Sequence, residues 1–353
     1  MALNTVSSDR LSTNVKNTNF TAAEKQDLTD DILPLATQFG QSKNLIINGA
    51  MNVAQRGTSS TSDGYHTCDR WKLNFGTVDE APTQAQVDVQ SSATPYTLGL
   101  KKCFKVTNGN QTSGAQAGTV LRFRYCIEAQ DIANSGWNYT SSSSYITISF
   151  WCRSSVAQNF FCDLQTSDGT AQNFAYQTGS LSADTWTKIT KTIPGGSNVA
   201  FDSDNGHGLF FNVNPFMGTN FSDAGHTLDA WSTFDSANRY PNNTTTWYTT
   251  NDSTFELTGV QIEVGSVATD FEHRSFSDEL RRCQRYFEKT SMYLSTNGYP
   301  FIYQTEKRAA ATVTTPDAGG TFHLAGVTPS TTSMWVRRTG GGGQYTVHMD
   351  AEL

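Results

Sequence analysis

Apolar and polar residues alternate along several short segments of the chain. The run Tyr145–Cys152 places an apolar residue at every second position, which is the period of a half-buried strand. The alternating apolar positions are Ile146, Ile148, Phe150 and Cys152 in this run, Leu121, Phe123, Tyr125 and Ile127 in a second, Leu98, Leu100, Phe104 and Val106 in a third, and Leu209, Phe211 and Val213 in a fourth. Turns rich in glycine, serine and asparagine separate the runs. The pattern predicts a mainly β chain with a β-sandwich of the jelly-roll type.

The alternation changes phase near residue 259. Phe255 and Leu257 are followed by Val260 and Ile262, so the inward positions shift by one residue around Gly259. A glycine at a phase shift is typical of a β-bulge. We therefore expect a bulge at this position.

A helical period of apolar residues marks residues 1–43. Thr21 and Glu24 form a capping-box pattern, and Pro34 interrupts the helix that follows. The apolar face consists of Leu28, Ile32, Leu35 and Phe39. About three turns with one apolar stripe are not stable alone in water. We expect this face to serve assembly, by docking on its own copies or on other proteins; packing on the chain's main domain is the alternative.

A second helix is predicted over residues 275–289. Ser277 is suited to cap it, and Leu280, Cys283 and Phe287 share one face. Short β runs return after it. The predicted organisation is a helical anchor (1–43), a jelly-roll β-sandwich (44–274), a connector helix (275–289) and a small C-terminal β domain (290–353).

Composition limits the classes of function. Hydrophobic residues make up 37% of the 353 residues, aromatic residues 12% and charged residues 16%, which favours extended β structure over disorder. The net charge of -7 supplies no general positive field for nucleic acid. No apolar stretch is long enough to span a membrane, and the first residues do not resemble a signal peptide. We expect no nucleic-acid partner and no membrane insertion. The six cysteines lack the CxxC spacing of zinc sites, and free thiols are expected of a chain that folds in a reducing cytoplasm.

No catalytic constellation is recognisable. The six histidines are scattered, without metal-ligand spacing or a neighbouring nucleophile motif. Carboxylate pairs of the kind that glycosidases use are Asp163 with Asp168 and Asp223 with Asp229. These lie in turn-like contexts where Asp is favoured for local hydrogen bonds. The sequence predicts no catalytic residue, no cofactor and no enzyme activity.

Five short motifs follow one another from residue 44 onward. They are the opening segment 44–57 (Asn-Leu-Ile-Ile-Asn-Gly-Ala-Met-Asn-Val-Ala-Gln-Arg-Gly), Asp69-Arg70-Trp71, Ser149-Phe150-Trp151-Cys152-Arg153, the strand 255–265, and the run 268–287 with Cys283-Gln284-Arg285-Tyr286-Phe287. Their order, together with the final Asp350-Ala351-Glu352-Leu353, resembles a jelly-roll module found in bacteriophage tail-fibre and other virion proteins. Asp270 stands where proline is common in that family, and residues 1–43 have no counterpart in it.

The resemblance implies a carbohydrate-binding-module-like jelly roll, a connector helix and a small terminal β domain, assembled as a homotrimer. Modules that resemble this one often hold a structural calcium near their termini, and Asn48 with nearby carbonyls would be suited to bind it. No Asp-rich ligand loop is visible. No metal site is therefore predicted.

Four charged residues lie at otherwise apolar strand edges, namely Arg56, Asp69, Arg70 and Glu263. Buried charges must be paired, and these four balance as two opposite pairs. We predict a structural arginine–carboxylate network that joins the two ends of the jelly roll.

Aromatic rings in polar loops are candidate sugar contacts, because such rings stack on the faces of sugars. The candidates are Trp137 and Tyr139 in a Ser/Gly-rich loop, and Trp231, Tyr240, Trp247 and Tyr248 in the polar stretch 214–251. A connection of that length in a compact domain is usually functional or interface-forming. The alternative is that these rings pack on the sandwich or between subunits.

The predicted function is that of a non-enzymatic phage virion structural protein, a trimeric tail-fibre or receptor-binding subunit that contacts host surface glycans. Such a protein assembles in the host bacterial cytoplasm, resides in the virion and joins other virion proteins through residues 1–43. Two alternatives remain open. One is a purely structural head fibre, decoration or tail adaptor protein, and the other is a polysaccharide-degrading tailspike.

Overall fold

The computed structural model describes residues 43–353 apart from 295–296, 298, 317–323, 326–328 and 339–342. Contacts divide the chain into Met1–Lys43 and Asn44–Leu353. The predicted assembly face of Leu28, Ile32, Leu35 and Phe39 lies outside the described residues.

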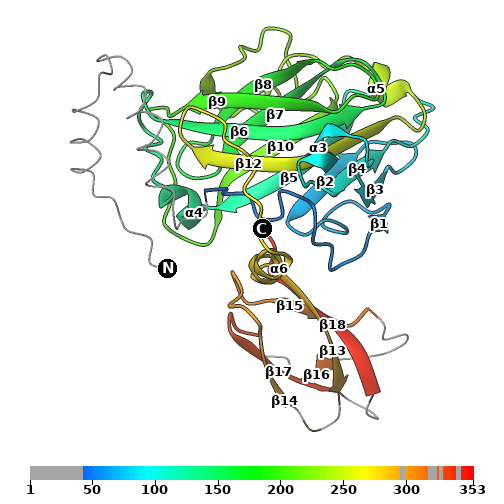
Figure 1. Ribbon diagram of the computed structural model, residues 1–353, viewed down its shortest axis with the longest axis vertical. Helices are drawn as coiled ribbons and strands as arrows, with labels where there is room; N and C mark the ends of the chain where they lie inside the picture. The colour runs from blue at the N-terminus through cyan, green and yellow to red at the C-terminus, as the bar shows by residue number, and fades with distance from the viewer. Residues whose placement is uncertain (1–42, 295–296, 298, 317–323, 326–328, 339–342) are drawn as a thin grey trace, which may run out of the picture. The chain divides into compact units, whose positions relative to one another are not determined.

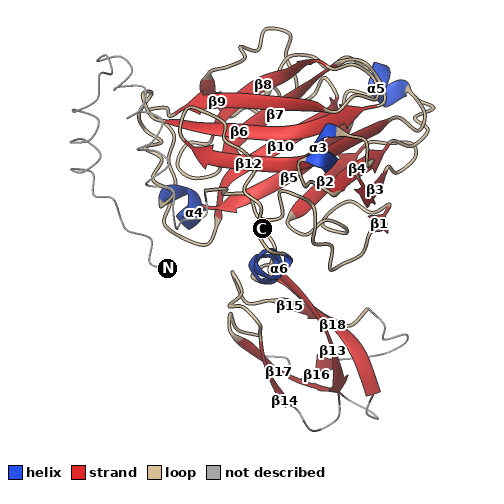
Figure 2. Ribbon diagram, viewed as in Figure 1, coloured by secondary structure: helices blue, strands red, loops and turns tan. Residues whose placement is uncertain are grey.

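Two antiparallel sheets form the larger part of the second unit (Figures 1 and 2). Sheet A has the order β1 (Ser59–Ser60), β3 (Thr83–Asp88), β4 (Lys102–Thr107), β12 (Thr254–Val264), β6 (Tyr145–Ser154) and β9 (Thr187–Pro194). Sheet B has the order β11 (Trp231–Thr233), β8 (Gln172–Ser180), β7 (Asn159–Thr166), β10 (His207–Met217), β5 (Val120–Glu128) and β2 (Trp71–Gly76). Three short helices lie in the connections: α3 (Thr94–Thr97), α4 (Ala129–Ala133) and α5 (Thr246–Thr249). The chain is a jelly-roll β-sandwich, as the alternation predicted.

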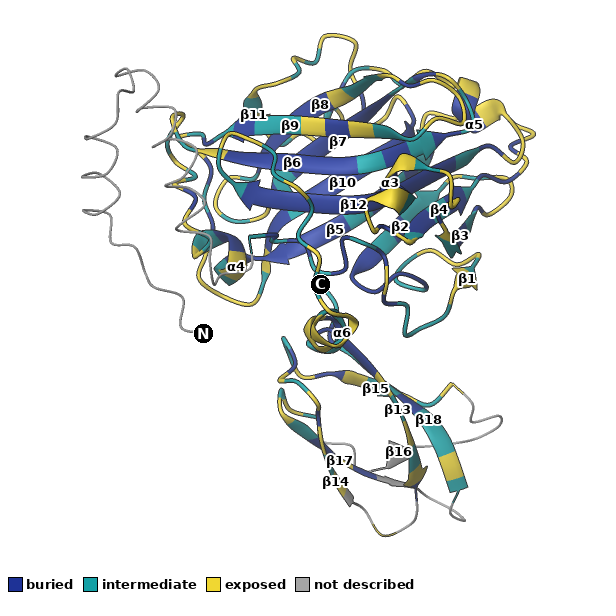
Figure 3. Ribbon diagram, viewed as in Figure 1, coloured by how far each residue is buried: buried dark blue, intermediate teal, exposed yellow. Residues whose placement is uncertain are grey.

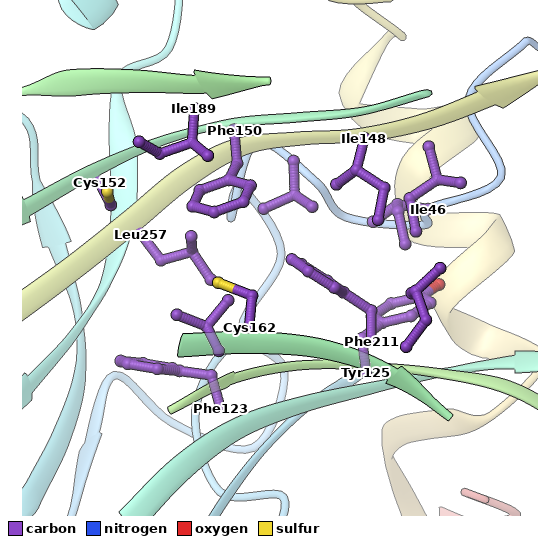
Figure 4. Packing of buried hydrophobic residues seen from close by; sticks show 14 of the residues in the cluster. Ile46, Phe123, Tyr125, Ile148, Phe150, Cys152, Cys162, Ile189, Phe211 and Leu257 are labelled. Carbon is purple, nitrogen blue, oxygen red and sulfur yellow. The ribbon is translucent and has the colours of Figure 1, made fainter. Parts of the chain in front are cut away.

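Aromatic side chains hold the two sheets together. Phe104 of sheet A meets Phe123 of sheet B edge to face, with ring centroids 4.9 Å apart. Phe150 and Phe211 form a second contact across the interior at 5.7 Å (Figure 4). Such pairs add about 0.5–1.5 kcal/mol each beyond the area that they bury. The central strands β10 and β12 are consequently buried along most of their length (Figure 3).

The predicted bulge at Gly259 is confirmed. The register of β12 against β6 shifts between Thr258 and Gln261, and Gly259 has φ +61°. A Cβ atom at this position would lie 2.5 Å from Leu100 Cδ1. Both the backbone conformation and the close packing therefore require glycine.

One predicted strand face is wrong at its start. Leu98 is 53% exposed and follows the helical turn α3, while β4 begins only at Lys102. Pro95 stands in the first turn of that helix, and Gly99 leaves it with φ +89°. These two residues impose a turn where the apolar spacing alone predicted a strand.

The connector helix α6 spans Phe276–Gln284 and is shorter than the predicted helix 275–289. Its cap is Ser275 rather than Ser277, since the Ser275 hydroxyl accepts the Asp278 N–H at 3.2 Å. Phe287 lies in the following strand, so it shares no helix face with Cys283. Just beyond the helix, Arg285 and Tyr286 contact Glu128 of β5, as described below.

A small β region follows the helix. One sheet has the order β13 (Phe287–Leu294), β18 (Gly343–Asp350) and β15 (Thr312–Thr314), and the other has the order β14 (Tyr299–Ile302), β17 (Ser333–Arg338) and β16 (Leu324–Ala325). They enclose a second core that includes Leu294, Met334, Val336, Val347 and Met349.

All six cysteines are free and buried, as expected. Across the described residues, no helix combines the length and the apolar character that crossing a membrane requires.

Candidate functional site

The outer face of sheet B carries polar side chains on adjacent strands. In β5, Phe123 and Tyr125 point into the core, so Arg122 and Arg124 point outward. The same alternation turns Asp163 and Gln165 of β7 and Phe210, Asn212 and Asn214 of β10 outward. We call these seven residues, Arg122, Arg124, Asp163, Gln165, Phe210, Asn212 and Asn214, the polar face.

Strand register brings the polar face together. Arg124 stands opposite Asn212, and Asn212 stands opposite Asp163. Phe210 stands opposite Gln165 in the next row of the same sheet. Side chains directly opposite one another in an antiparallel pair lie about 4.5–5.5 Å apart at Cβ, close enough to interact.

A buried layer lies at the centre of this face. The Asp163 carboxylate accepts the side-chain amide of Asn212 at 2.7 Å and that of Asn214 at 2.9 Å. Asp163 is only 2% exposed, and both asparagines are fully buried. Both Oδ1 atoms of Asn212 and Asn214 lack a hydrogen-bond partner within the described part of the chain. The Asp163 carboxylate is thus already engaged by two side-chain amides of the protein itself.

The two arginines are half-buried beside this layer. The Arg124 guanidinium lies over the Phe210 ring at 3.8 Å and donates a long hydrogen bond of 3.4 Å to Gln165 Oε1. The Nε atoms of Arg122 and Arg124 are buried and have no partner among the described residues. Burial lowers the pKa of Arg122 to about 10, and repulsion by Arg124 and Arg239 acts in the same direction. Burial likewise lowers the pKa of Arg124, against the attraction of Asp163.

The polar stretch 214–251 packs on the sandwich instead of projecting from it. The Tyr240 ring stacks on Phe161 with a centroid distance of 5.8 Å and an interplanar angle of 3°. The Asn173 side chain donates to the Arg239 carbonyl at 2.7 Å. This stretch therefore covers part of the outer side of sheet B, including Phe161 beside Asp163.

Four predicted sugar-stacking residues are wrong because their rings are buried. Trp137, Tyr240, Trp247 and Tyr248 are each at most 2% exposed. Trp247 donates its indole N–H to the Thr254 carbonyl at 3.0 Å, and Tyr248 stacks on Phe216 at 4.5 Å. Rings enclosed in this way offer no free face to a sugar.

The other two predicted contacts, Tyr139 and Trp231, are half-buried. Tyr139 packs edge to face on Phe201 at 5.0 Å, and Trp231 packs on Phe174 at 5.4 Å. Trp231 also donates to the Pro194 carbonyl at 2.7 Å. Both remain predictions, although neither belongs to the polar face.

The predicted charge network pairs differently from the expectation. Arg56 contacts Asp350 at 2.9 Å and Glu352 at 3.3 Å, and Arg70 also binds Glu352. Asp69 and Glu263 are not the partners of these arginines. Asp69 accepts hydrogen bonds from Gln55. Glu263 accepts from Gln261 at 2.8 Å and from the Thr269 hydroxyl at 2.6 Å. The arginines thus bind the C-terminal segment to the jelly roll and do not join the two ends of the sandwich.

Aromatic rings complete this junction. The Arg70 guanidinium lies over the Tyr286 ring at 3.3 Å and over the Tyr125 ring at 5.1 Å. Arg285 donates to both oxygens of Glu128, at 2.7 and 2.8 Å, and the Tyr286 hydroxyl donates to the same carboxylate at 2.5 Å. Burial alone would raise the pKa of Glu128, but these hydrogen bonds outweigh it and lower the pKa. The motifs around residues 70, 285 and 352 therefore meet in one structural contact.

The carboxylate pairs considered for catalysis have structural partners. Asp168 accepts the Asp202 N–H at 3.0 Å, and Asp223 accepts the Gly225 N–H at 2.7 Å. Asp229 forms an ion pair with Lys191 at 2.6 Å. Each of these three contacts holds a local turn or a neighbouring strand in place.

Asn48, considered as a calcium ligand, is also engaged locally. Its side-chain oxygen accepts the Val53 N–H at 2.9 Å, and its amide donates to the Val53 and Asp69 carbonyls. Among the described residues, no group of three or more histidine, cysteine or acidic side chains is placed to hold a metal ion.

Two pockets lie near the junction. One, of about 560 Å³, is lined by Arg56, Tyr65, Phe287 and Asp350 among others, and its charges already pair with each other. The other, of about 570 Å³, is lined by Arg281, Arg282 and Asp131 among others. Residues Arg281 and Arg282 are exposed, so water already solvates their charges. The polar face holds the desolvated groups and is the stronger candidate.

The fold and the polar face together define a jelly-roll β-sandwich with a polar outer sheet. No protein-family model matches the chain, and no curated protein matches it. Solved structures with a distant likeness in fold include the enzymatically active domain of tailspike protein 4 of bacteriophage CBA120, at 10% identity and TM-score 0.33 over 63% of this chain and 21% of that one.

Two further structures share the likeness. The N-terminal cellulose-binding domain of β-1,4-glucanase C from Cellulomonas fimi has 9% identity and TM-score 0.29, over 62% of this chain and 99% of that domain. A family 11 carbohydrate-binding module from Clostridium thermocellum, in complex with a mixed-linked tetrasaccharide, has 12% identity and TM-score 0.27, over 60% and 98%. This chain therefore spans about a fifth of the tailspike domain and nearly the whole of the two modules. At this distance, the assignment of the fold rests on the strand order of the chain itself.

Proposed function

We propose that this chain is a non-enzymatic structural subunit of a phage particle that attaches to carbohydrate through the polar face. The observation that carries the proposal is the combination of a half-exposed ring, Phe210, with half-exposed Arg122, Arg124 and Gln165 above a buried hydrogen-bonded layer. The Arg124 guanidinium and the His207 ring contact Phe210, so a sugar would pack on the part of the ring that remains exposed. A sugar offers an apolar ring face together with hydroxyl groups. A ring beside oriented donors and acceptors matches both.

The polar face also adds a free-energy cost to folding that an ordinary structural surface does not add. A buried polar atom without a partner costs about 1–3 kcal/mol. Several such atoms gather here, at Arg122, Arg124, Asn212 and Asn214. Asn212 and Asn214 are fully buried, whereas Arg122 and Arg124 are half-exposed and can be reached by a ligand.

Assembly as a homotrimer forms the second part of the proposal. Tyr293, Ile302 and Trp335 of the small β region are 60%, 75% and 46% exposed. Association of copies would cover these side chains. Residues 1–43 would join the subunit to other virion proteins. The same exposed residues favour the second candidate function, a purely structural head fibre, decoration or tail adaptor protein.

Glycan binding by the full chain tests the attachment role. An array of bacterial surface polysaccharides should retain the wild-type protein, and Phe210→Ala should weaken that binding about fivefold or more, since a stacked ring contributes about 1 kcal/mol. Phe276→Ala is the matched control, because Phe276 is 60% exposed and lies outside the sandwich on α6. Binding of no polysaccharide, with the protein located between capsid or tube subunits on imaged particles, would favour the purely structural role. Polysaccharide cleavage would favour a tailspike.

A further inference from the structure

Positive charge exceeds negative charge on the polar face. The outward positions of β2, β5, β7 and β10 include Lys72, Arg122 and Arg124 as cations. The carboxylates among them are Asp163 and Glu128, and Glu128 is already paired with Arg285. Lys72 stands opposite Arg124, so the cations lie side by side across two strands. The whole protein has the opposite balance, with a net charge of -7. The excess is thus a local feature of this face.

Asp163 attracts both arginines, but its oxygens are engaged elsewhere. Asp163 accepts the amides of Asn212 and Asn214 on its two oxygens, and no salt bridge joins it to Arg122 or Arg124 in the described part of the chain. The segment that packs beside this face adds a further cation, Arg239, and the hydroxyl of Tyr240. Arg122 has no hydrogen-bond partner at Nε, and its neighbours Arg124 and Arg239 repel it. These groups raise the free energy of the folded protein when no ligand is bound.

Resting on the carbohydrate attachment proposed above, we propose that the glycan bound at the polar face is acidic, and that its carboxylate or phosphate group is held between Arg122 and Arg124. A guanidinium presents its donors in a planar fork that matches both kinds of oxyanion. The Arg124 guanidinium lies over the Phe210 ring at 3.8 Å and has further N–H donors besides the one that Gln165 accepts. Hydroxyl groups of the same sugar would reach Gln165 beside it.

The burial of Arg122 and Arg124 makes it possible to distinguish a binding role from a structural role by experiment. A structural arginine is stabilising because it is paired, so its removal lowers the melting temperature. Arg122 is half-buried and forms no salt bridge among the described residues, and burial has lowered its pKa despite the attraction of Asp163. Its removal should therefore leave the fold as stable as before or more stable, while the anion loses its partner. Opposite effects on stability and on binding are expected of a functional site.

The test compares matched acidic and neutral glycans. Full-length protein is titrated with bacterial polysaccharide fragments that carry a hexuronate, another sugar carboxylate or a phosphodiester, each beside its carboxyl-reduced or dephosphorylated counterpart. The wild type should bind the acidic member at least about tenfold more tightly, since a charge-assisted hydrogen bond contributes more than a neutral one. Arg122→Gln and Arg124→Gln should each weaken this binding about 10- to 100-fold. The melting temperature of Arg122→Gln should equal or exceed that of the wild type.

Lys188→Gln is the matched control, because Lys188 is an exposed cation on β9 of the other sheet. Its removal changes the net charge equally and should leave the affinity unchanged. Equal affinity for the acidic and neutral members, or an equal loss in Lys188→Gln, would overturn the inference while the attachment role stands. Failure to bind any glycan would overturn the attachment role, and the inference with it. Selective binding of the phosphodiester or of the carboxylate members would support the inference and identify the oxyanion.

Discussion

Replacing Glu352 with alanine removes the carboxylate that both Arg56 and Arg70 contact. The side chains of Arg70 and Glu352 are 1% and 5% exposed, so water does not replace the lost partner. Arg56 keeps Asp350 at 2.9 Å, whereas Arg70 keeps only the Cys126 carbonyl and the two tyrosine rings. The variant therefore buries one arginine without an opposite charge.

The magnitude follows from that geometry. Removing one partner of a buried ion pair costs about 3–5 kcal/mol, because the remaining charge is left unpaired. For a folded unit of this size, 1 kcal/mol corresponds to about 2 °C in melting temperature, so we expect a decrease of about 6–10 °C. Glu352→Gln preserves the shape and one acceptor and should lose a smaller amount, which separates charge from packing.

A double-mutant cycle with Arg70→Met provides the assay. Free energies of unfolding are measured by urea denaturation for the two single variants and for the double variant. Because Met leaves no buried charge, the double variant should be at least about 2 kcal/mol more stable than the sum of the single effects predicts. Glu352→Ala melting within 1–2 °C of the wild type, roughly the effect of a surface substitution, would refute the reasoning. So would strictly additive effects.

Three further predictions concern the jelly roll. Arg56→Ala should lose about 2–4 kcal/mol, because it loses Asp350, Glu352 and the Phe287 ring at 3.6 Å, and it should keep any glycan specificity; unchanged melting would contradict the network. Gly259→Ala should destabilise the protein more than Gly179→Ala. Both positions have positive φ, but only at Gly259 would the added Cβ lie 2.5 Å from Leu100. Equal losses of melting temperature in the two variants would exclude the packing argument. Burial raises the pKa of Asp69 to about 6 against the attraction of Arg56 and the hydrogen bonds from Gln55, so its protonated form favours the fold. That contribution is complete below about pH 4 and is lost as the pH rises through 6, so Asp69→Asn should gain about 3 kcal/mol relative to the wild type between pH 4 and 7.5; a pH-independent difference would contradict the assignment.

The sequence predicted those features that depend on neighbouring residues. The strand period turned Ile148 and Phe123 inward and Arg122 and Arg124 outward, because alternation is a local property of extended backbone. The bulge followed from a single glycine at a phase shift. The strand prediction failed where proline and glycine impose a turn in spite of the apolar spacing, as at Leu98.

Contacts between residues that are far apart in the sequence could not be predicted from such local patterns. Glu352 is 282 residues from Arg70, and no local pattern indicates that the two side chains meet. The polar face was missed because its residues become neighbours only through the strand order β7, β10 and β5. The outward polar positions were visible in each strand, and joining them required the pairing of the strands. Trp247 and Tyr248 were misplaced because a polar connection can fold back and bury its few aromatic rings.

The pairing of Arg70 with Glu352 links the fold to the order of synthesis. A ribosome adds about 5–20 residues per second, so the guanidinium emerges roughly 15–60 s before its carboxylate does. During that interval the strands of the jelly roll can form, but Arg70 has no carboxylate to pair with. A polypeptide released before Asp350 lacks the carboxylates that pair with Arg56 and Arg70 and should be degraded faster than the full chain. Copies truncated before Asp350 should therefore be less stable than the full chain, because Arg70 is buried without its carboxylate.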